Sequence, residues 1–282
     1  MLPLGKKVIV IDGGFGSELE KRNLGGVPED LNITHAADIR EIHRAYACAD
    51  IISANSFGLN RIKYKGKFTL REVAEKAVEN ARAAGKQVFF DVGPTGAMMA
   101  PLGALSFDEA YAAYAEVAEI TRGIVDGYIA ETFSDLYELK ACVLALKEHS
   151  DKPVFATMTF DEKGRTLTGT TPEIAALTLA GLGVDALGVN CSLGPKELYG
   201  VVSRLVACSP VPVVVQPNCG LPVLRGGKTV YELDINTFDE YTKKFIDMGV
   251  SAVGGCCGTT PEFIERIAKY RGLPVRRVAV PE

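Results

Sequence analysis

Short runs of β-branched and other apolar residues alternate with longer amphipathic segments along the whole chain. Eight of these runs predict strands, at residues 7–12, 51–55, 87–91, 127–131, 153–157, 186–190, 212–216 and 251–255. The segments between and after them predict helices at 35–48, 69–84, 107–123, 134–148, 172–181, 195–208, 237–248 and 261–270. Strands that alternate with helices form parallel sheets, and eight such repeats predict an α/β fold, a (βα)8 TIM barrel.

A doubly wound open sheet has the same alternation of strands and helices, and it stays the alternative fold. No linker, low-complexity segment or internal repeat divides the chain. We therefore expect one barrel domain over residues 1–282. The chain ends soon after the eighth predicted helix, so we expect no further domain in it.

Polar and glycine-rich segments follow seven of the eight predicted strands. They lie at 12–16, 55–58, 91–96, 131–133, 190–192, 216–220 and 254–258. Active sites of the barrel fold are built at the C-terminal ends of the strands. The sequence therefore predicts that these segments meet at one mouth and carry the chemistry.

The chain has 282 residues and a formal net charge of −4, with acidic and basic residues spread throughout. It has no basic stripe of the kind that follows a nucleic-acid backbone and no polybasic patch for a membrane surface. The N-terminus carries charges where a signal peptide needs apolar residues, and no stretch reaches the roughly 18 apolar residues of a membrane span. We expect a cytoplasmic protein that acts on small molecules, with neither nucleic acid nor membrane as partner.

Three of the seven cysteines, Cys191, Cys256 and Cys257, follow the sixth and eighth predicted strands and would meet at the mouth of a closed barrel. Glycines on both sides of the adjacent pair leave the backbone free to turn both side chains toward one point. Three thiolates with a fourth position open are typical of a catalytic zinc site, whereas a structural site is closed by four ligands. We therefore predict zinc at these three cysteines.

Other interpretations of the cysteines remain. Cys219, at the end of the seventh strand, is a possible fourth ligand, and a disulfide between Cys256 and Cys257 is possible, although adjacent-residue bridges are strained and a reducing compartment opposes them. The remaining cysteines lie in predicted helices and are expected to be packing residues: Cys48, Cys142 and Cys208. The three histidines also fall in or just before predicted helices, where we expect solvated or capping roles: His35, His43 and His149.

An open zinc site with three thiolates is better suited to a thiol substrate than to water. Three thiolates donate more negative charge than the 2+ ion carries, which weakens its power to acidify water. A substrate thiol, with a free pKa of about 8.5, would bind as a thiolate and act as a nucleophile. Alkylation of a thiol is the predicted reaction. A barrel aldolase would need a lysine at a strand end, and none of the eight predicted strands ends in one.

Five motifs in register carry a resemblance to a known family. They are Asp-Gly-Gly-Phe-Gly (12–16), Ala-Asn-Ser-Phe-Gly-Leu-Asn-Arg (54–61), Glu-Thr-Phe-Ser-Asp (131–135), Gly-Val-Asn-Cys-Ser (188–192) and Gly-Gly-Cys-Cys-Gly-Thr-Thr-Pro (254–261). Together they resemble the homocysteine S-methyltransferase family. Within it, the segments 28–32, 40–46 and 216–222 are similar to the homocysteine-binding domain of cobalamin-dependent methionine synthase.

The resemblance implies roles for particular residues. Zinc would be held by Cys191, Cys256 and Cys257, with the homocysteine sulfur in the open position. The backbone at Gly13, Gly14 and Phe15 would receive the substrate carboxylate, and Asp12 and Glu131 would face the substrate ammonium. The ordinary alternative for Gly13 and Gly14 is a βα turn, and the ordinary alternative for Asp12 and Glu131 is helix capping. Asn55, Asn190 and Asn218 are expected to orient thiolates or substrate through hydrogen bonds.

The resemblance leaves the methyl donor open. A methionine-synthase module would take the methyl group from methylcobalamin, which a corrinoid- and folate-binding domain or protein would present in trans. A stand-alone enzyme would use a small cation such as S-methylmethionine or betaine, but the chain has no Trp, the best aromatic face for such a cation. A weaker cage could come from Phe15, Phe57, Tyr128 and Phe133. A non-catalytic subunit that binds homocysteine or zinc is the third alternative.

Overall fold

The computed structural model describes residues 3–226 and 228–276, and within them the predicted barrel is confirmed. Eight parallel strands follow the order β1-β10-β7-β6-β5-β4-β3-β2. Their bounds are Ile9–Val10 (β1), Ile51–Ser53 (β2), Gln87–Val92 (β3), Gly127–Phe133 (β4), Val154–Met158 (β5), Ala186–Asn190 (β6), Val213–Gln216 (β7) and Ala252–Val253 (β10). The Asp12 N–H donates to the Ile51 carbonyl at 3.1 Å, which joins β1 to β2. This contact closes the sheet, so the alternative of an open doubly wound sheet is wrong.

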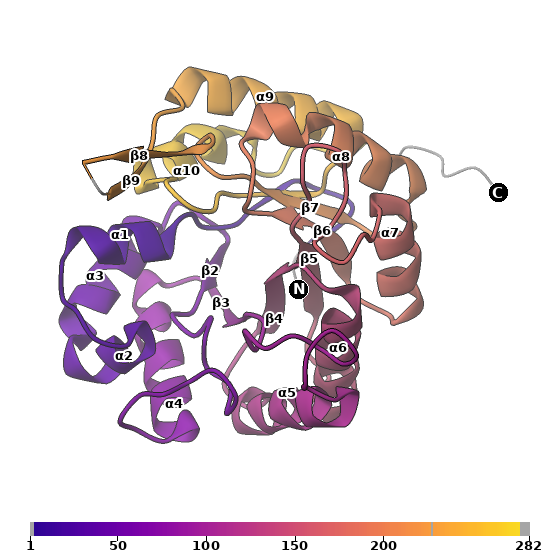
Figure 1. Ribbon diagram of the computed structural model, residues 1–282. Coiled ribbons are helices and arrows are strands. Elements are labelled where there is room, and N and C mark those ends of the chain that lie inside the picture. Colours follow the sequence, from indigo (N-terminus) through magenta and orange to yellow (C-terminus); the bar gives the residue numbers. More distant parts are fainter. Residues whose placement is uncertain (1–2, 227, 277–282) are drawn as a thin grey trace.

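The helices form a ring around the strands (Figure 1). In the described part of the chain they are α1 (Phe15–Lys21), α2 (Leu31–Thr34), α3 (Ala36–Ala45), α4 (Leu70–Ala81), α5 (Phe107–Thr121), α6 (Leu136–His149), α7 (Pro172–Gly181), α8 (Pro195–Cys208), α9 (Ile235–Met248) and α10 (Pro261–Ile267). Each of the eight predicted helices has a counterpart among them. Side-chain caps define several starts: Thr69 and Ser106 each form a capping box, at α4 and α5.

Several elements were not predicted from the sequence. Helices α1 and α2 lie between β1 and β2, together with a 3-10 turn at Pro28–Asp30. An antiparallel hairpin of β8 (Pro222–Arg225) and β9 (Lys228–Tyr231) lies between β7 and α9. Figure 1 shows this hairpin beside α10, on the same side of the barrel as α1. The hairpin brings a side chain to the site described below.

Side chains that alternate along the strands fill the barrel in layers. The apolar interior layer consists of Ile9, Ile11, Ile51, Phe89, Ile129, Phe155, Ala186, Val214 and Ala252. Side chains on a strand repeat every two residues, so the positions two further toward the C-terminal end also point inward. Most of these positions are polar: Ser53, Asp91, Glu131, Thr157 and Gln216. The hydrophobic core of the barrel thus ends in a polar layer at the mouth.

No helix in the described part of the chain is both long enough and apolar enough to cross a bilayer.

Candidate active site

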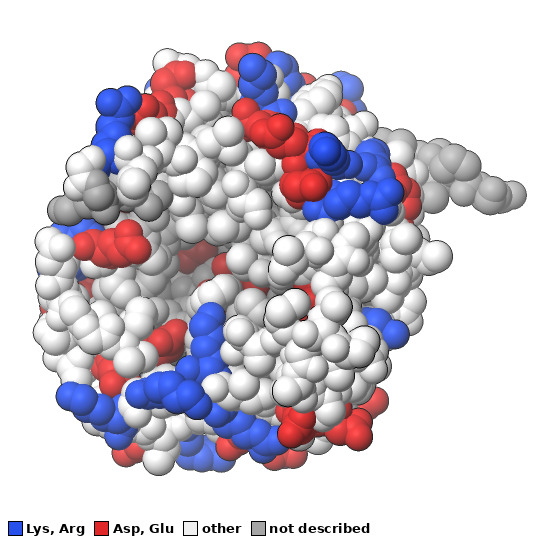
Figure 2. Space-filling model, viewed as in Figure 1, with Lys and Arg blue, Asp and Glu red and all other residues white. Residues whose placement is uncertain are grey.

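A cavity of about 540 Å³ opens at the C-terminal ends of the strands. Its walls come from the loops after β1, β2, β6 and β10, from helix α1, from the C-terminal end of β4 and the polar layer of the barrel, and from the β8–β9 hairpin. Figure 2 shows this face hollowed at its centre, with acidic side chains in and around the hollow. The structure thus brings the predicted strand-end segments to one mouth.

Three thiols lie together in this cavity. Cys191 directly follows β6, and Cys256 and Cys257 lie three and four residues after Val253, the last residue of β10. Their sulfur atoms all lie within 4.8 Å of one another, and the Cys191 and Cys257 sulfurs are 3.8 Å apart. Tetrahedral zinc with Zn–S bonds of about 2.3 Å separates its sulfur ligands by about 3.8 Å. The three cysteines therefore fit a metal ion of this kind.

The backbone at the thiols is unusual. Cys191 and the following Ser192 have φ angles of 58° and 61°, a left-handed conformation that non-glycine residues adopt at a cost. We expected the glycines beside the cysteine pair to permit a sharp turn, but only Gly258 has a positive φ, 79°. Gly255 is needed for space instead, because a Cβ atom there would lie 2.2 Å from the Thr259 hydroxyl oxygen. Close packing against Thr259 holds the pair in place.

Hydrogen bonds among the thiols shift their pKa values in opposite directions. Hydrogen bonds from Cys191 and Cys256 lower the pKa of Cys257, whereas Cys256 has a raised pKa because it donates to its neighbours and is buried. The Cys257 N–H also donates to the Asn218 side-chain oxygen at 3.1 Å. One thiolate is therefore stabilised at this site, as a soft metal ligand requires.

Cys219 lies near the three thiols but turns away from them. Its N–H donates to the Cys257 carbonyl at 2.9 Å, while its sulfur lies 3.4 Å from the Leu233 carbonyl, to which it donates. Within the described residues, the group of metal-ligating atoms contains Cys191, Cys256 and Cys257 without Cys219. The geometry does not favour the fourth-ligand interpretation of Cys219.

Asp12 and Glu131 both line the cavity, but their surroundings differ. The two carboxylate oxygens of Asp12 accept hydrogen bonds from the N–H and the hydroxyl of Ser53, at 2.8 and 2.9 Å. Burial raises the pKa of Asp12 to about 7, and burial together with the charges of Asp12 and Cys257 raises that of Glu131 to about 8. The two groups make the cavity favourable for a cation.

The turn after β1 is more fully engaged than expected. Gly14 N–H donates to the backbone and hydroxyl oxygens of Thr259, at 2.9 and 3.0 Å, and Phe15 N–H donates to the Gly13 carbonyl at 2.8 Å. A Cβ atom at Gly14 would lie 2.6 Å from the Cys256 carbonyl oxygen. The glycines therefore dock this turn against the cysteine segment, so two of the three N–H groups expected to receive a carboxylate already have partners.

Asn190 links three strands beneath the thiols. Its side-chain oxygen accepts from the Thr132 N–H and the Thr157 hydroxyl, both at 2.8 Å, and its amide lies 3.8 Å from the Cys256 sulfur. Asn55 also lines the cavity, but its amide donates to the Pro28 carbonyl at 2.8 Å. Asn190 is thus in contact with a thiol, while Asn55 ties the second loop to the 3-10 turn.

Several side chains at the mouth were given no role from the sequence. They are Glu29, Asp91, Gln216 and Tyr231, all of which line the cavity. Asp91 and Gln216 lie two residues beyond the interior residues Phe89 and Val214, so the alternation of the strands was a signal that could have found them. Tyr231 comes from the unpredicted hairpin, and its hydroxyl helps to lower the pKa of the Cys257 thiol.

Two expectations about aromatic rings and histidines are wrong. Tyr128 and Phe133 are fully buried and do not line the cavity, so of the four aromatic residues considered for a cage only Phe15 and Phe57 lie at the mouth. His43 is neither solvated nor a cap. It is fully buried against the Phe15 ring, with ring centroids 4.6 Å apart.

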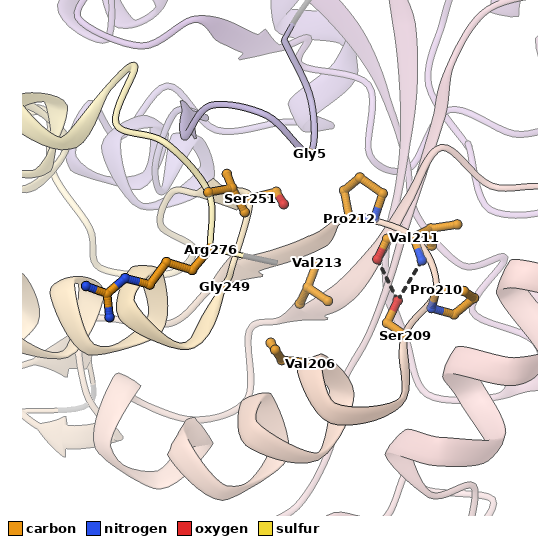
Figure 3. A pocket seen from close by; sticks show the side chains of 11 residues that line it. Gly5, Val206, Ser209, Pro210, Val211, Pro212, Val213, Gly249, Ser251 and Arg276 are labelled. Carbon is orange, nitrogen blue, oxygen red and sulfur yellow. Dashed lines mark hydrogen bonds between the residues drawn. The ribbon is translucent and has the colours of Figure 1, made fainter. Parts of the chain in front are cut away.

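A second cavity, of about 260 Å³, lies at the opposite end of the barrel (Figure 3). Pro212 and Ser251 in its wall directly precede β7 and β10, which places it where the strands begin. The hydroxyl of Ser209 is occupied by the backbone of Val211, as Figure 3 shows. None of the described residues that line this cavity is a cysteine or carries a carboxylate, so the chemistry is concentrated at the first.

Comparison with known proteins agrees with this site. A family model described as Homocysteine S-methyltransferase matches residues 9–271. The methionine synthases of Mycobacterium leprae (strain TN) and Mycobacterium tuberculosis (strain ATCC 25618 / H37Rv) are 33% and 34% identical over 294 aligned residues. The alignments cover 94% of this chain and 24% and 25% of those proteins. The homocysteine methyltransferase MmuM from Escherichia coli, in its metallated form, aligns with a TM-score of 0.78 at 22% identity, over 94% of this chain and 96% of that one.

Fold and site together define a (βα)8 barrel with three thiols at its catalytic mouth. The chain belongs to the homocysteine S-methyltransferase family. The predicted enzyme class, a methyltransferase, is therefore confirmed at the level of the family. The chain spans about a quarter of the length of the methionine synthases that it matches.

Proposed function

We propose that this protein transfers a methyl group to the thiol of homocysteine, giving methionine, with zinc as its metal. The observation that carries the proposal is the cluster of three sulfur atoms within 4.8 Å of one another on the wall of the cavity. Sulfur ligands favour zinc among the common cellular cations, and the separation of the sulfurs suits tetrahedral geometry. In the reaction an S–CH3 bond forms, the bond from the donor to the methyl group breaks, and the substrate thiol has already lost its proton.

Bound zinc would supply a positive centre that keeps a substrate thiol ionised at neutral pH. The protein's own groups would hold and orient that substrate. Cys191, Cys256 and Cys257 would hold the ion, and Asn190 would fix Cys256 and the strand end beside it. No general base is required, because the thiol is deprotonated when it binds.

The α-amino and carboxylate groups of homocysteine would lie against the acidic and backbone groups of the mouth. Asp12 and Glu131 would accept the ammonium, and the turn at Gly13, Gly14 and Phe15 would receive the carboxylate after local adjustment of its hydrogen bonds. Asn55 would act less directly, by holding the loop after β2 to Pro28. The substrate would thus be selected both by the charges of its amino and carboxylate groups and by its thiol.

For the donor, we propose a corrinoid-bound methyl group presented by a separate domain or protein. Support comes from the methionine synthases that the chain matches over about a quarter of their length, which suggests that residues 1–282 act as one homocysteine-binding module. The free thiols favour a reducing, cytoplasmic setting. A sulfonium donor such as S-methylmethionine remains the second candidate, since Phe15 and Phe57 lie at the mouth. A non-catalytic homocysteine- or zinc-binding subunit is the third.

A donor panel with zinc analysis tests the proposal. The purified protein is loaded with zinc and incubated with homocysteine and methylcobalamin, S-methylmethionine, S-adenosylmethionine or betaine in turn. We expect one zinc per chain and methionine formation from methylcobalamin. Cys257→Ala should abolish both, whereas Cys219→Ala, which alters a nearby thiol that points elsewhere, should retain both.

Different results would separate the alternatives. Turnover only with S-methylmethionine would replace the corrinoid donor by a sulfonium. Zinc and homocysteine binding without turnover from any donor would favour the non-catalytic subunit. Full activity in the Cys257→Ala variant would refute the zinc mechanism.

A further inference from the structure

Asp91 carries a carboxylate that lines the cavity and has an oxygen without a hydrogen-bond partner among the described residues. It lies in β3, two residues beyond the interior residue Phe89, so its side chain also faces the barrel axis. The residue is 9% exposed and lines the cavity. Its Oδ1 atom is buried and accepts no hydrogen bond from any described residue.

The neighbours of Asp91 do not account for this carboxylate. Ser56 bonds only the backbone of Asp91, at 2.9 and 3.2 Å. Lys63 forms no ion pair with Asp91 in the described part of the chain, since its ammonium lies over the Phe57 ring, 4.3 Å from the centroid. A buried carboxylate without a counter-ion is costly, and such a group is typical of a binding site for a cation.

The other two carboxylates of the cavity differ in how fully they are engaged. Both oxygens of Asp12 are held by Ser53. Glu131, like Asp91, has no side-chain hydrogen bond within the described part of the chain, and the two lie on neighbouring strands. Asp91 pairs in register with Ile129 of β4. Glu131 lies two residues further along β4 toward the mouth, on the same inward face and diagonally opposite Asp91.

We propose that Asp91 is a specificity-determining residue that binds the α-ammonium of the substrate together with Glu131. The proposal rests on the proposed function and extends it. An ammonium has three N–H donors, so it can bond both free carboxylates at once. Asp12 accepts the third N–H, because each of its oxygens keeps a lone pair beside the hydrogen bond from Ser53. The site thereby selects thiols that carry an α-amino group over thiols that carry a carboxylate alone.

The test compares two ligands in two variants. Homocysteine and 4-mercaptobutyrate, the same molecule without its amino group, are titrated calorimetrically into the zinc-loaded protein. Asp91→Asn removes the charge but keeps the shape of the side chain. Asp151→Asn makes the same chemical change on the exposed surface, just before β5 at the opposite end of the barrel, and serves as the matched control.

We expect Asp91→Asn to weaken homocysteine binding by about tenfold to hundredfold, the loss of a charge-assisted hydrogen bond. Its affinity for 4-mercaptobutyrate should change by less than about threefold, since that ligand lacks the group that Asp91 binds. The control should leave both affinities unchanged. Zinc content should be the same in all three proteins, and Asp91→Asn should unfold at a temperature equal to or above the wild type, because a buried carboxyl group without a partner has been replaced by an uncharged group of the same shape.

Two outcomes overturn the inference while the proposed function stands: unchanged homocysteine binding in Asp91→Asn, or an equal loss for both ligands. Equal loss would mean that Asp91 shapes the cavity rather than binding the ammonium. If the zinc-loaded wild type binds neither ligand, the proposed function itself fails. The wild-type titration thus separates the two failures.

Discussion

Backbone conformation at single residues is unusual where the mouth is built. Thr132, Cys191 and Ser192 have φ angles of 65°, 58° and 61°. Thr132 and Cys191 line the cavity, and Ser192 directly follows Cys191. Such conformations cost of order 1–3 kcal/mol each and persist where surrounding structure holds them. Hydrogen bonds from Thr132 to Asn190 and from Cys191 N–H to the Gln216 carbonyl provide that support. These backbone conformations place the side chains of Glu131 and Cys191 on the wall of the cavity.

His43 leads to a prediction about acid stability. Burial lowers the pKa of His43 to about 3, while an unfolded histidine titrates near 6.5. Between these values the unfolded chain binds a proton that the folded protein excludes, so the contribution to stability is full above about pH 6.5 and falls as the pH drops toward 3. At pH 5 the loss is roughly 2 kcal/mol.

Replacing His43 by Phe should remove this loss while keeping the contact with the Phe15 ring. Urea denaturation at pH 7.5 and pH 5, with zinc chelated in both proteins, gives the free energies of unfolding. Wild type should lose roughly 2 kcal/mol more than His43→Phe between the two pH values. Parallel losses would show that His43 does not remain neutral in the fold.

At the level of single residues, the sequence predicted the three thiols because their position after strands and their flanking glycines are local signals. Asp91 received no role, since its lack of a partner depends on where Ser56 and Lys63 point. His43 was misjudged for a similar reason. Its burial comes from α1, a helix that the hydrophobic pattern did not reveal. Tertiary contacts decide both cases.

Among the elements, the β8–β9 hairpin and α1 show why part of the fold escaped prediction. All four residues of β8 are exposed, so it has no alternation of apolar and polar positions. Only the Gly226-Gly227 pair between the strands signals a hairpin. Helix α1 has seven residues and one buried side chain, Leu19, too few to form an apolar stripe. The strands and longer helices were predictable because each buries a regular face.

The hairpin positions Tyr231 over the cysteine segment. Its ring packs on Gly258, where a Cβ atom would lie 2.4 Å from the ring, and its hydroxyl helps to lower the pKa of Cys257. Tyr231→Phe should keep one zinc per chain but lower kcat/KM for homocysteine roughly tenfold, because polar groups beside metal ligands tune the charge of those ligands. Tyr199→Phe, on the exposed face of α8, is the control for steady-state assays. Unchanged kinetics in Tyr231→Phe would remove the hairpin from the mechanism.

Helix α6 fixes the loop after β3 through one buried carboxylate. Glu138 accepts hydrogen bonds from the Thr95 N–H and hydroxyl, at 2.7 and 2.6 Å, and from the Tyr114 hydroxyl at 2.9 Å. Glu138→Ala should lower the free energy of unfolding by about 3 kcal/mol or more, since three donors lose their acceptor. Glu148→Ala removes an exposed partner of Tyr111 on the same helix and should cost less than about 1 kcal/mol. Equal costs in urea denaturation would contradict this assignment.

For the whole molecule, closure of the barrel makes the site possible. Cys191 and the Cys256-Cys257 pair are more than sixty positions apart in the chain, yet β6, β7 and β10 are adjacent in the sheet. β1 lies beside β10, so the turn after it packs on the cysteine segment through Thr259. Strand order therefore places thiols, carboxylates and the β1 turn around one cavity, which local sequence alone does not specify.

X-ray absorption at the zinc edge tests the central claim most directly, because it counts sulfur ligands in the zinc-loaded protein. The account predicts three sulfur neighbours at about 2.3 Å without substrate and four after homocysteine is added. The Cys257→Ala variant should not hold the metal under the same conditions. Four sulfur neighbours before homocysteine is added, or an unchanged count afterwards, would contradict a site that uses three cysteines to bind the thiol of its substrate.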